Sequence, residues 1–195
     1  KLDLSKELIL GGLERPELSL NIHECYAEAE KNEKLAELVR TESGSGIVYF
    51  SLIQTLENAA RFFVQKKIPF QKYHGDLPAD QRRRNQNDFL TGKVGWILAT
   101  PAFGLGIDKP DIRHVIHYEI PSSIEAYFQE VGRAGRDGQR ADGHFLFSED
   151  DLTIQMQFLT WAYPEKEFIQ KVYDLIESKP DVVAVQGFDF LREQM

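Results

Sequence analysis

Residues 43–147 alternate short apolar runs with longer runs of helical spacing, and this alternation constrains the fold more than any other feature of the chain. The run at 46–50 is typical of a buried strand, and between Leu52 and Val64 apolar side chains recur every three or four residues. Further strands are predicted at 70–73, 94–99, 113–118 and 143–147. Because connections this long imply parallel strands, we expect an α/β fold with a parallel sheet covered by helices on both faces.

Proline and serine mark where two of the helices begin. Pro78 opens a predicted helix over residues 78–90. Another helix starts after Pro121, with Ser122 or Ser123 as its N-cap.

Composition argues against membrane-spanning, secreted and disulfide-bonded classes of protein. The chain has 195 residues, of which 42% are hydrophobic and 28% charged, an ordinary globular mixture. No apolar run approaches the ~20 residues that cross a bilayer, and the first residues do not read as a secretion signal. The single cysteine, Cys25, excludes an internal disulfide and a cysteine-built zinc site. We therefore expect an intracellular protein with no membrane partner and no zinc.

Charge is distributed unevenly along the chain. The net charge of −8 argues against a protein that binds nucleic acid nonspecifically over its whole surface. Residues 1–42 carry −4, residues 43–147 carry +2 and residues 148–195 carry −6. A cleft in the slightly basic middle segment is therefore the place where phosphates are expected to bind.

Three parts are expected along the chain. They are an approach segment over 1–22 with a first helix over 30–41 (together 1–42), the α/β domain over 43–148, and an acidic helical tail over 149–195. Pro164 and Pro180 divide this tail into about three short helices.

Residues 127–138 (YFQEVGRAGRDG) carry the most informative chemistry. On a helix over 122–133, three apolar side chains fall on one side and are expected to pack on the sheet: Ile124, Phe128 and Val131. Three polar side chains fall on the opposite side, if the helical turn continues: Gln129, Arg133 and Arg136. Arginine is suited to binding an anion there, because its planar and permanently charged fork matches phosphate oxygens. The plainer interpretation is a surface salt-bridge face with Glu130 and Asp137, and for two arginines alone it is favoured.

Two further stretches place polar groups after predicted strands, where open α/β sheets bind ligands. After the strand at 94–99, Thr100 offers a hydroxyl, and Asp108 offers a carboxylate that accepts from ribose hydroxyls. Two glycines in this loop permit close backbone approach: Gly104 and Gly106. Ser51, His74 and Gly75 follow the strands at 46–50 and 70–73. A lone Gly-x-Gly is usually only a turn, and a lone histidine is more often structural than a ligand.

Together these stretches resemble the second RecA-like domain of superfamily 2 helicases, and specifically the RecQ family. Residues 99–118 (ATPAFGLGIDKPDIRHVIHY) resemble motif V and its continuation, and 129–138 (QEVGRAGRDG) resemble motif VI. Residues 46–51 (GIVYFS) resemble motif IV, and 73–77 (YHGDL) resemble the histidine-containing segment between motifs IV and V. Residues 15–18 (RPEL) resemble the linker that leaves the first RecA-like domain.

The resemblance implies the C-terminal RecA-like half of an ATP-dependent DNA helicase with 3′-to-5′ polarity. ATP and Mg²⁺ would be held mainly by an N-terminal RecA-like domain of the same polypeptide. By similarity, Arg133 and Arg136 act as arginine fingers on the γ-phosphate, and Gln129 joins their network. Asp108 and Gly106 contact the nucleotide. Four groups hold the backbone of single-stranded or partly duplex DNA: Ser51, His74, Gly75 and Thr100.

Three features depart from the family pattern. The chain contains no Gly-x-x-x-x-Gly-Lys-[Ser/Thr] motif and no Asp-Glu-x-His box, so we expect these 195 residues alone to lack ATPase activity. RecQ proteins usually place a four-cysteine zinc module after motif VI, but residues 149–195 contain no cysteine.

Two other functions remain open. The first is an RNA-dependent motor on the same scaffold, because no residue here separates the two kinds of backbone with certainty. The second is a non-catalytic RecA-like nucleic-acid-binding module, which would suit the missing Walker A motif but has no use for both arginines. We expect the protein in the cytoplasm, associated with the nucleoid, if it is bacterial, and in the nucleus if it is eukaryotic.

Overall fold

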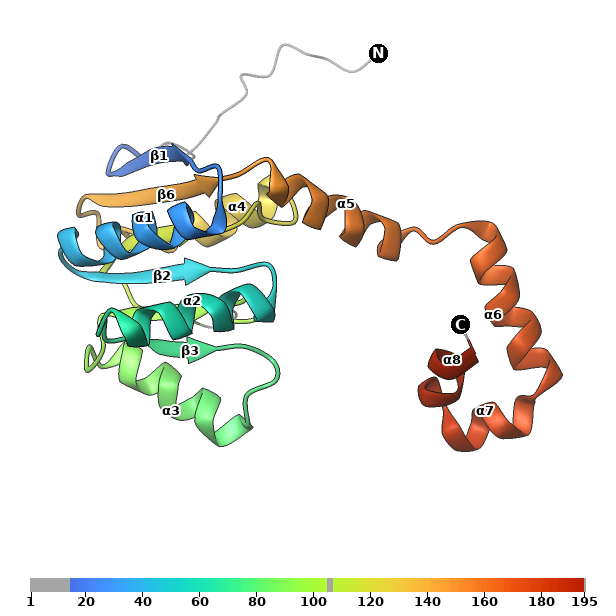
Figure 1. The fold of residues 1–195 in the computed structure, drawn as a ribbon. Coiled ribbons are helices and arrows are strands. Elements are labelled where there is room, and N and C mark those ends of the chain that lie inside the picture. Colours follow the sequence, from blue (N-terminus) through green and yellow to red (C-terminus); the bar gives the residue numbers. More distant parts are fainter. Residues whose placement is uncertain (1–14, 105–106, 195) are drawn as a thin grey trace, which may run out of the picture. The chain divides into compact units, whose positions relative to one another are not determined.

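The computed structural model describes residues 15–104 and 107–194. Residues 15–152 belong to one compact unit, built on a six-stranded sheet in the order β1-β6-β5-β2-β4-β3 (Figure 1). Its strands are β1 (Leu18–Glu24), β2 (Ser45–Tyr49), β3 (Gln71–Tyr73), β4 (Trp96–Ala99), β5 (Ile112–His117) and β6 (Ala141–Phe147). Every pair of neighbouring strands runs parallel, which confirms the predicted parallel sheet.

Helices cover both faces of this sheet, also as predicted. On one face α1 (Glu28–Thr41) and α2 (Ile53–Gln65) pack their apolar side chains, among them Leu35 and Phe63, on β2, β4 and β5. On the other face Phe89 of α3 (Ala79–Leu90) and Val131 of α4 (Ile124–Val131) join a second core. Figure 1 shows α1 and α2 in front of the sheet.

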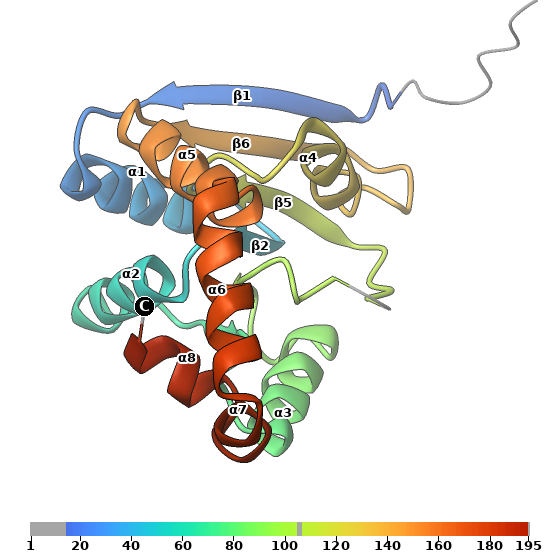
Figure 2. The ribbon, with the colours of Figure 1, turned by 90° about the vertical axis from the view of Figure 1, so that its right-hand side faces the viewer.

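Strand β1 is the element that the sequence analysis does not predict. Residues 18–22 were expected to be an approach segment, and this expectation is wrong, because Leu18–Glu24 forms an edge strand beside β6 (Figure 2). Leu20 pairs with Gly143, more than a hundred residues later in the chain, so no local pattern marks the partner. The other five strands begin or end within two residues of their predicted limits.

Helix α4 starts as predicted but ends early. Ser123 is its N-cap, and its hydroxyl accepts the Ala126 N–H at 3.1 Å. The prediction that Ile124 and Phe128 pack on the sheet is wrong, because they are 71% and 61% exposed. Only Val131 of the predicted apolar face is buried. Ile124 instead lines an open apolar pocket together with Leu20 and Ile22 of β1.

The tail forms a second unit from residue 153 onward and is described here by itself. It contains most of α5 (Asp150–Ala162), then α6 (Lys166–Ser178), α7 (Pro180–Gln186) and α8 (Phe188–Gln194). Pro164 lies between α5 and α6, and Pro180 is the first residue of α7, so both prolines separate helices as expected. The expected number of about three helices is too low, because Gly187 ends α7 and α8 follows it. No helix in the described part of the chain is long and apolar enough to cross a membrane.

A buried ion pair attaches the first turn of α5 to the sheet unit. The Lys31 ammonium on α1 donates to both carboxylate oxygens of Asp151, at 2.6 and 2.8 Å, and to the Tyr118 carbonyl at 2.8 Å. Both side chains are about 95% buried. Burial raises the pKa of Asp151, and the hydrogen bonds from Lys31 oppose that rise.

Candidate functional site

The loop after α4 is a tight turn over residues 132–138 that carries Arg133 and Arg136, and we call it the arginine turn. Gly132 is the C-cap of α4, and the Gly135 N–H donates to the Ile112 carbonyl, the first residue of β5, at 2.9 Å. Gly135 has a φ of +65°, a conformation that side chains rarely adopt. A Cβ there would also lie 2.9 Å from the Gln139 carbonyl oxygen. The turn is therefore closed tightly against the amino end of β5.

Arg133 reaches from this turn to the loop that follows β4. Its Nη1 donates to the Gly104 carbonyl at 2.7 Å. A Cβ at Gly104 would lie 2.4 Å from Nη2 of Arg133, so the contact requires glycine. Within residues 15–104 and 107–194, the Arg133 Nε is buried and has no hydrogen-bond partner. Arg133 is thus held by a neutral carbonyl and keeps its charge uncompensated at that contact.

Arg136 also connects the arginine turn to the loop after β4, at a point closer to the end of that loop. Its Nη1 donates to the Ile107 carbonyl at 3.3 Å and lies 3.9 Å from Oδ1 of Asp108. The Arg136 side chain is 40% exposed and that of Asp108 is 91% exposed. The structure therefore brings together three of the predicted nucleotide-binding residues, while Gly106 lies outside the described residues.

Gln129 is exposed on α4. Among the residues that the structure describes, no hydrogen bond joins its side chain to Arg133 or Arg136.

The two carboxylates that a surface salt-bridge face would need are engaged elsewhere. Glu130 is buried, and its Oε2 lies 2.8 Å from Nε2 of His117 on β5. Asp137 accepts from Nη2 of Arg113 at 2.6 Å, and this hydrogen bond lowers the pKa of Asp137. Neither carboxylate is therefore paired with Arg133 or Arg136, as a surface salt-bridge face would require.

A buried tyrosine supports the loop that Arg133 contacts. The Tyr49 hydroxyl on β2 donates to the Phe103 carbonyl at 2.9 Å, next to Gly104. Burial raises the pKa of Tyr49, and the nearby Arg133 opposes that rise. The hydroxyl therefore stays protonated and remains a donor.

Four predicted nucleic-acid contacts lie at the carboxyl ends of three neighbouring strands. Ser51 follows β2, Thr100 follows β4, and His74 and Gly75 follow β3. The Thr100 N–H donates to the Tyr73 carbonyl at 3.1 Å, which places the ends of β4 and β3 side by side. The sheet therefore aligns these residues along one edge.

Ser51 is positioned by a buried carboxylate. Oε2 of Glu119 accepts the Ser51 N–H at 2.7 Å and lies 3.4 Å from the Leu52 nitrogen, while the Ser51 hydroxyl donates to the Ile120 carbonyl at 3.1 Å. Burial raises the pKa of Glu119, and hydrogen bonds from Thr55 and these amides oppose the rise. The turn that begins α2 thus depends on Glu119, which the sequence analysis did not single out.

The His74 ring is mostly covered. It is 4% exposed, and its Nε2 lies 3.0 Å from Oε1 of Glu57, which also accepts from Lys72 at 2.8 Å. Burial raises the pKa of Glu57, but the hydrogen bonds from Lys72 and His74 outweigh it and leave the pKa lowered. Gly75 is exposed, with open space where a Cβ would stand. Backbone at Gly75 is therefore more accessible here than the histidine side chain.

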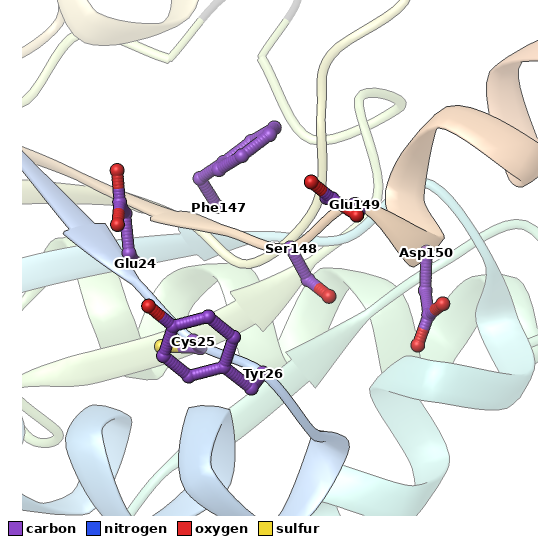
Figure 3. A pocket seen from close by; sticks show the side chains of 7 residues that line it. All are labelled: Glu24, Cys25, Tyr26, Phe147, Ser148, Glu149 and Asp150. Atoms are coloured by element: carbon purple, nitrogen blue, oxygen red, sulfur yellow. The ribbon is translucent and has the colours of Figure 1, made fainter.

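A separate pocket of about 370 Å³ lies at the carboxyl ends of β1 and β6 (Figure 3). Seven residues line it: Glu24, Cys25, Tyr26, Phe147, Ser148, Glu149 and Asp150. Burial raises the pKa of the Cys25 thiol. Three lining residues are acidic and none is basic, so the pocket is unsuited to phosphate. Across the described residues, no three His, Cys, Asp or Glu side chains are grouped to hold a metal ion.

Residues 30–138 match the family model described as "Helicase conserved C-terminal domain". This match covers more than half of the chain, which therefore belongs to the family of helicase conserved C-terminal domains.

Two curated relatives show which group of helicases the chain is similar to. The chain is 34% identical over 171 residues to "Probable ATP-dependent DNA helicase RecS" of Bacillus subtilis (strain 168), covering 86% of this chain and 34% of that protein. It is 34% identical over 174 residues to "ATP-dependent DNA helicase RecQ" of Synechocystis sp., covering 85% of this chain and 36% of that protein. The resemblance to the RecQ family is thereby confirmed. The chain spans about a third of the length of these relatives.

A solved structure supports the fold. The structure of S. cerevisiae Dbp5 bound to RNA and ADP BeF3 matches with a TM-score of 0.62 and 23% identity, over 75% of this chain and 39% of that chain. The predicted RecA-like fold followed by helices is confirmed.

Proposed function

We propose that this chain is the C-terminal motor domain of an ATP-dependent 3′-to-5′ DNA helicase, with Arg133 and Arg136 as arginine fingers. One observation carries the proposal. Glu130 and Asp137, the carboxylates nearest to the two arginines in sequence, are engaged by His117 and Arg113. A protein that used this turn only as a scaffold would have no reason to leave the charge of Arg133 to a backbone carbonyl and that of Arg136 to an exposed carboxylate 3.9 Å away.

The loops fit a nucleotide phosphate and ribose. Arg136 is partly exposed, and the Asp108 carboxylate is almost fully exposed, so it is free to accept from ribose hydroxyls. Arg133 is held by Gly104, and its fork offers further N–H groups to an anion. ATP with Mg²⁺, held mainly by an N-terminal RecA-like domain of the same polypeptide, supplies the phosphoryl group for transfer. The two arginines neutralise negative charge as it develops, and Gln129 is proposed to join them.

Contacts to single-stranded or partly duplex DNA are assigned to the carboxyl edge of the sheet. Backbone N–H groups near Gly75 are suited to phosphate oxygens. Ser51, Thr100 and His74 are proposed to join them, and the Ser51 hydroxyl would have to leave the Ile120 carbonyl to donate to DNA. Such contacts carry no sequence information, which suits an enzyme that steps along any strand. A motor of this kind works inside the cell, in a bacterial cytoplasm or a eukaryotic nucleus.

ATP hydrolysis by the complete protein that carries this chain tests the proposal. We expect hydrolysis to be stimulated by single-stranded DNA and not by single-stranded RNA, and residues 1–195 alone to hydrolyse no ATP. Stimulation by RNA alone would assign the protein to the RNA-dependent motors. Absence of hydrolysis under every condition would leave the non-catalytic binding module as the better description. Turnover by the isolated chain would contradict the assignment of the ATP-holding residues to another domain.

A further inference from the structure

The turn before β1 lies against the arginine turn, although more than a hundred residues separate them in sequence. The Leu18 N–H donates to the Arg15 carbonyl at 3.0 Å and closes this first turn. The Glu17 carbonyl accepts the Ala141 N–H at 2.9 Å, where β6 begins. The side chain of Glu17 reaches the site where a Cβ of Gly135 would stand, at 3.4 Å from its Cγ.

Arg15 donates to the backbone on both sides of Arg133. Its Nη2 donates to the Ala134 carbonyl at 2.7 Å, and its Nη1 donates to the Gly132 carbonyl at 3.4 Å. The remaining Nε donates to the Glu17 carboxylate, which orients the guanidinium and lowers the pKa of Glu17. One planar fork therefore holds the carbonyl groups of the two residues that flank Arg133.

From this geometry we propose that Arg15 is a positioning residue for Arg133. The arginine turn contains three glycines, which leave its backbone intrinsically free. Backbone hydrogen bonds such as that from the Gly135 N–H to the Ile112 carbonyl close the turn, and Arg15 adds the side-chain support next to Arg133. Gly104 holds the guanidinium of Arg133, and Arg15 holds its main chain. A lysine at position 15 carries a compact point charge and lacks the fork that spans both carbonyls. The inference rests on the proposed role of Arg133.

The test is a double-mutant cycle on DNA-stimulated ATPase activity of the complete protein, with R15A, R133A and the pair. We expect R15A to lower kcat by about 10²-fold, because a displacement of ~1 Å at a catalytic group has that effect. KM for ATP should change less than about twofold, since ATP is held mainly elsewhere. In the R133A background, R15A should lower kcat by less than about twofold, because the residue that it positions is already absent.

Two further variants separate positioning from folding. R15K should fold with an unchanged melting temperature, yet recover little of the lost kcat. Arg40→Ala is the matched control, because Arg40 also donates to a backbone carbonyl, that of Lys66, at 3.0 Å but far from the arginine turn. It should retain wild-type kcat.

The outcomes also distinguish this inference from the proposed function. If R133A keeps wild-type kcat, the arginine-finger assignment fails. If R133A loses activity while R15A and R15K do not, only the positioning role of Arg15 fails. If R15A lowers kcat equally in the wild-type and R133A backgrounds, or if R15K has the wild-type kcat, the positioning role of Arg15 is likewise overturned.

Discussion

The arginine turn and the carboxyl edge of the sheet use polar side chains in opposite ways. At the carboxyl edge, His74 and Ser51 make hydrogen bonds to neighbouring protein groups, Glu57 and the Ile120 carbonyl. In the arginine turn, Arg133 and Arg136 donate to backbone carbonyls, and the nearest carboxylate of Asp108 lies 3.9 Å from Arg136. The carboxyl edge therefore presents mainly backbone groups to a ligand, whereas the arginine turn presents positively charged side chains.

The two regions are also separated along the strands. Ser51, His74 and Thr100 follow the carboxyl ends of β2, β3 and β4, whereas Gly135 is bonded to Ile112 at the amino end of β5. The two regions meet in the loop after β4, where Thr100 belongs to the carboxyl edge and Gly104 accepts from Arg133. Changes outside this loop should affect one region and leave the other intact.

Among substitutions of residues other than the two arginines, Gly104→Ala gives the largest expected effect, because it displaces the Arg133 guanidinium. The new Cβ would lie 2.4 Å from Nη2 of Arg133, and a flexible side-chain end moves away more easily than backbone. We expect kcat for ATP to fall by about 10²-fold, with DNA affinity within twofold of wild type. Steady-state ATPase assays and fluorescence anisotropy on the complete protein measure both.

Gly95→Ala is the matched control for this substitution. A Cβ at Gly95 would lie at an ordinary distance of 3.6 Å from the Gly44 carbonyl oxygen. Wild-type kcat in Gly104→Ala would show that the Arg133–Gly104 contact does not orient the arginine for catalysis.

Acid should weaken both regions together, because they share one sheet. His144 stacks between His23 and His114, and its burial lowers its pKa from 6.5 to about 4. Between these values the unfolded chain binds a proton that the folded chain does not, so stability falls as pH drops from about 6.5 to 4. The loss is about 2–3 kcal/mol by linkage.

Chemical denaturation at several pH values measures how the free energy of unfolding changes with pH and so checks this prediction. His144→Phe replaces the imidazole by a ring that does not titrate, so the dependence of unfolding free energy on pH over this range should become weaker. Burial also lowers the pKa of the neighbouring His23, which keeps part of that dependence. An unchanged slope in the variant would assign the acid sensitivity to other groups.

Glu119→Ala disturbs the carboxyl edge. It leaves the half-buried Ser51 N–H without its acceptor, which costs about 1 kcal/mol of unfolding free energy. DNA affinity should fall as the Ser51 turn loosens, whereas in the protein that remains folded the arginine turn is intact. Urea denaturation and anisotropy measure these effects. Glu119→Gln keeps an acceptor oxygen and should lose less stability; an equal loss in both variants would contradict this account of the turn.

Gly75→Glu gives the smallest expected effect and tests the carboxyl edge without disturbing the fold. Space is open where the side chain starts, so the melting temperature should stay within about 2 °C of wild type. The added negative charge should weaken binding of a single-stranded oligonucleotide about fivefold, near 1 kcal/mol. Ala29→Glu, exposed on α1, is the charge-matched control. Equal affinities for the two variants would remove Gly75 from the DNA-binding surface.

The sequence predicted the features that depend on neighbouring residues. Buried strands such as β2 and β4 are marked by their own apolar runs, and the Ser123 cap by its local pattern. The features that it missed depend on residues far apart in the chain. Strand β1 pairs across more than a hundred residues, and Arg15 reaches Ala134 across 119 positions.

The same reason explains why the environment of the arginines could not be predicted. Glu130 and His117 are 13 positions apart and meet only because α4 packs beside β5. The periodicity of α4 correctly predicted that Val131 is buried, but it could not show that Ile124 and Phe128 remain exposed. Roles in binding ATP and DNA came from the family resemblance and stay predictions.

Arg136→Ala in the complete protein tests the central claim most directly, with DNA-stimulated ATP hydrolysis as the readout. Arg140→Ala is the control, because Arg140 is exposed nearby and lies 3.8 Å from Asp142. The account predicts that kcat falls by about 10³-fold or more in Arg136→Ala and stays near wild type in Arg140→Ala. Equal, near-wild-type activity in both variants would contradict the arginine-finger assignment.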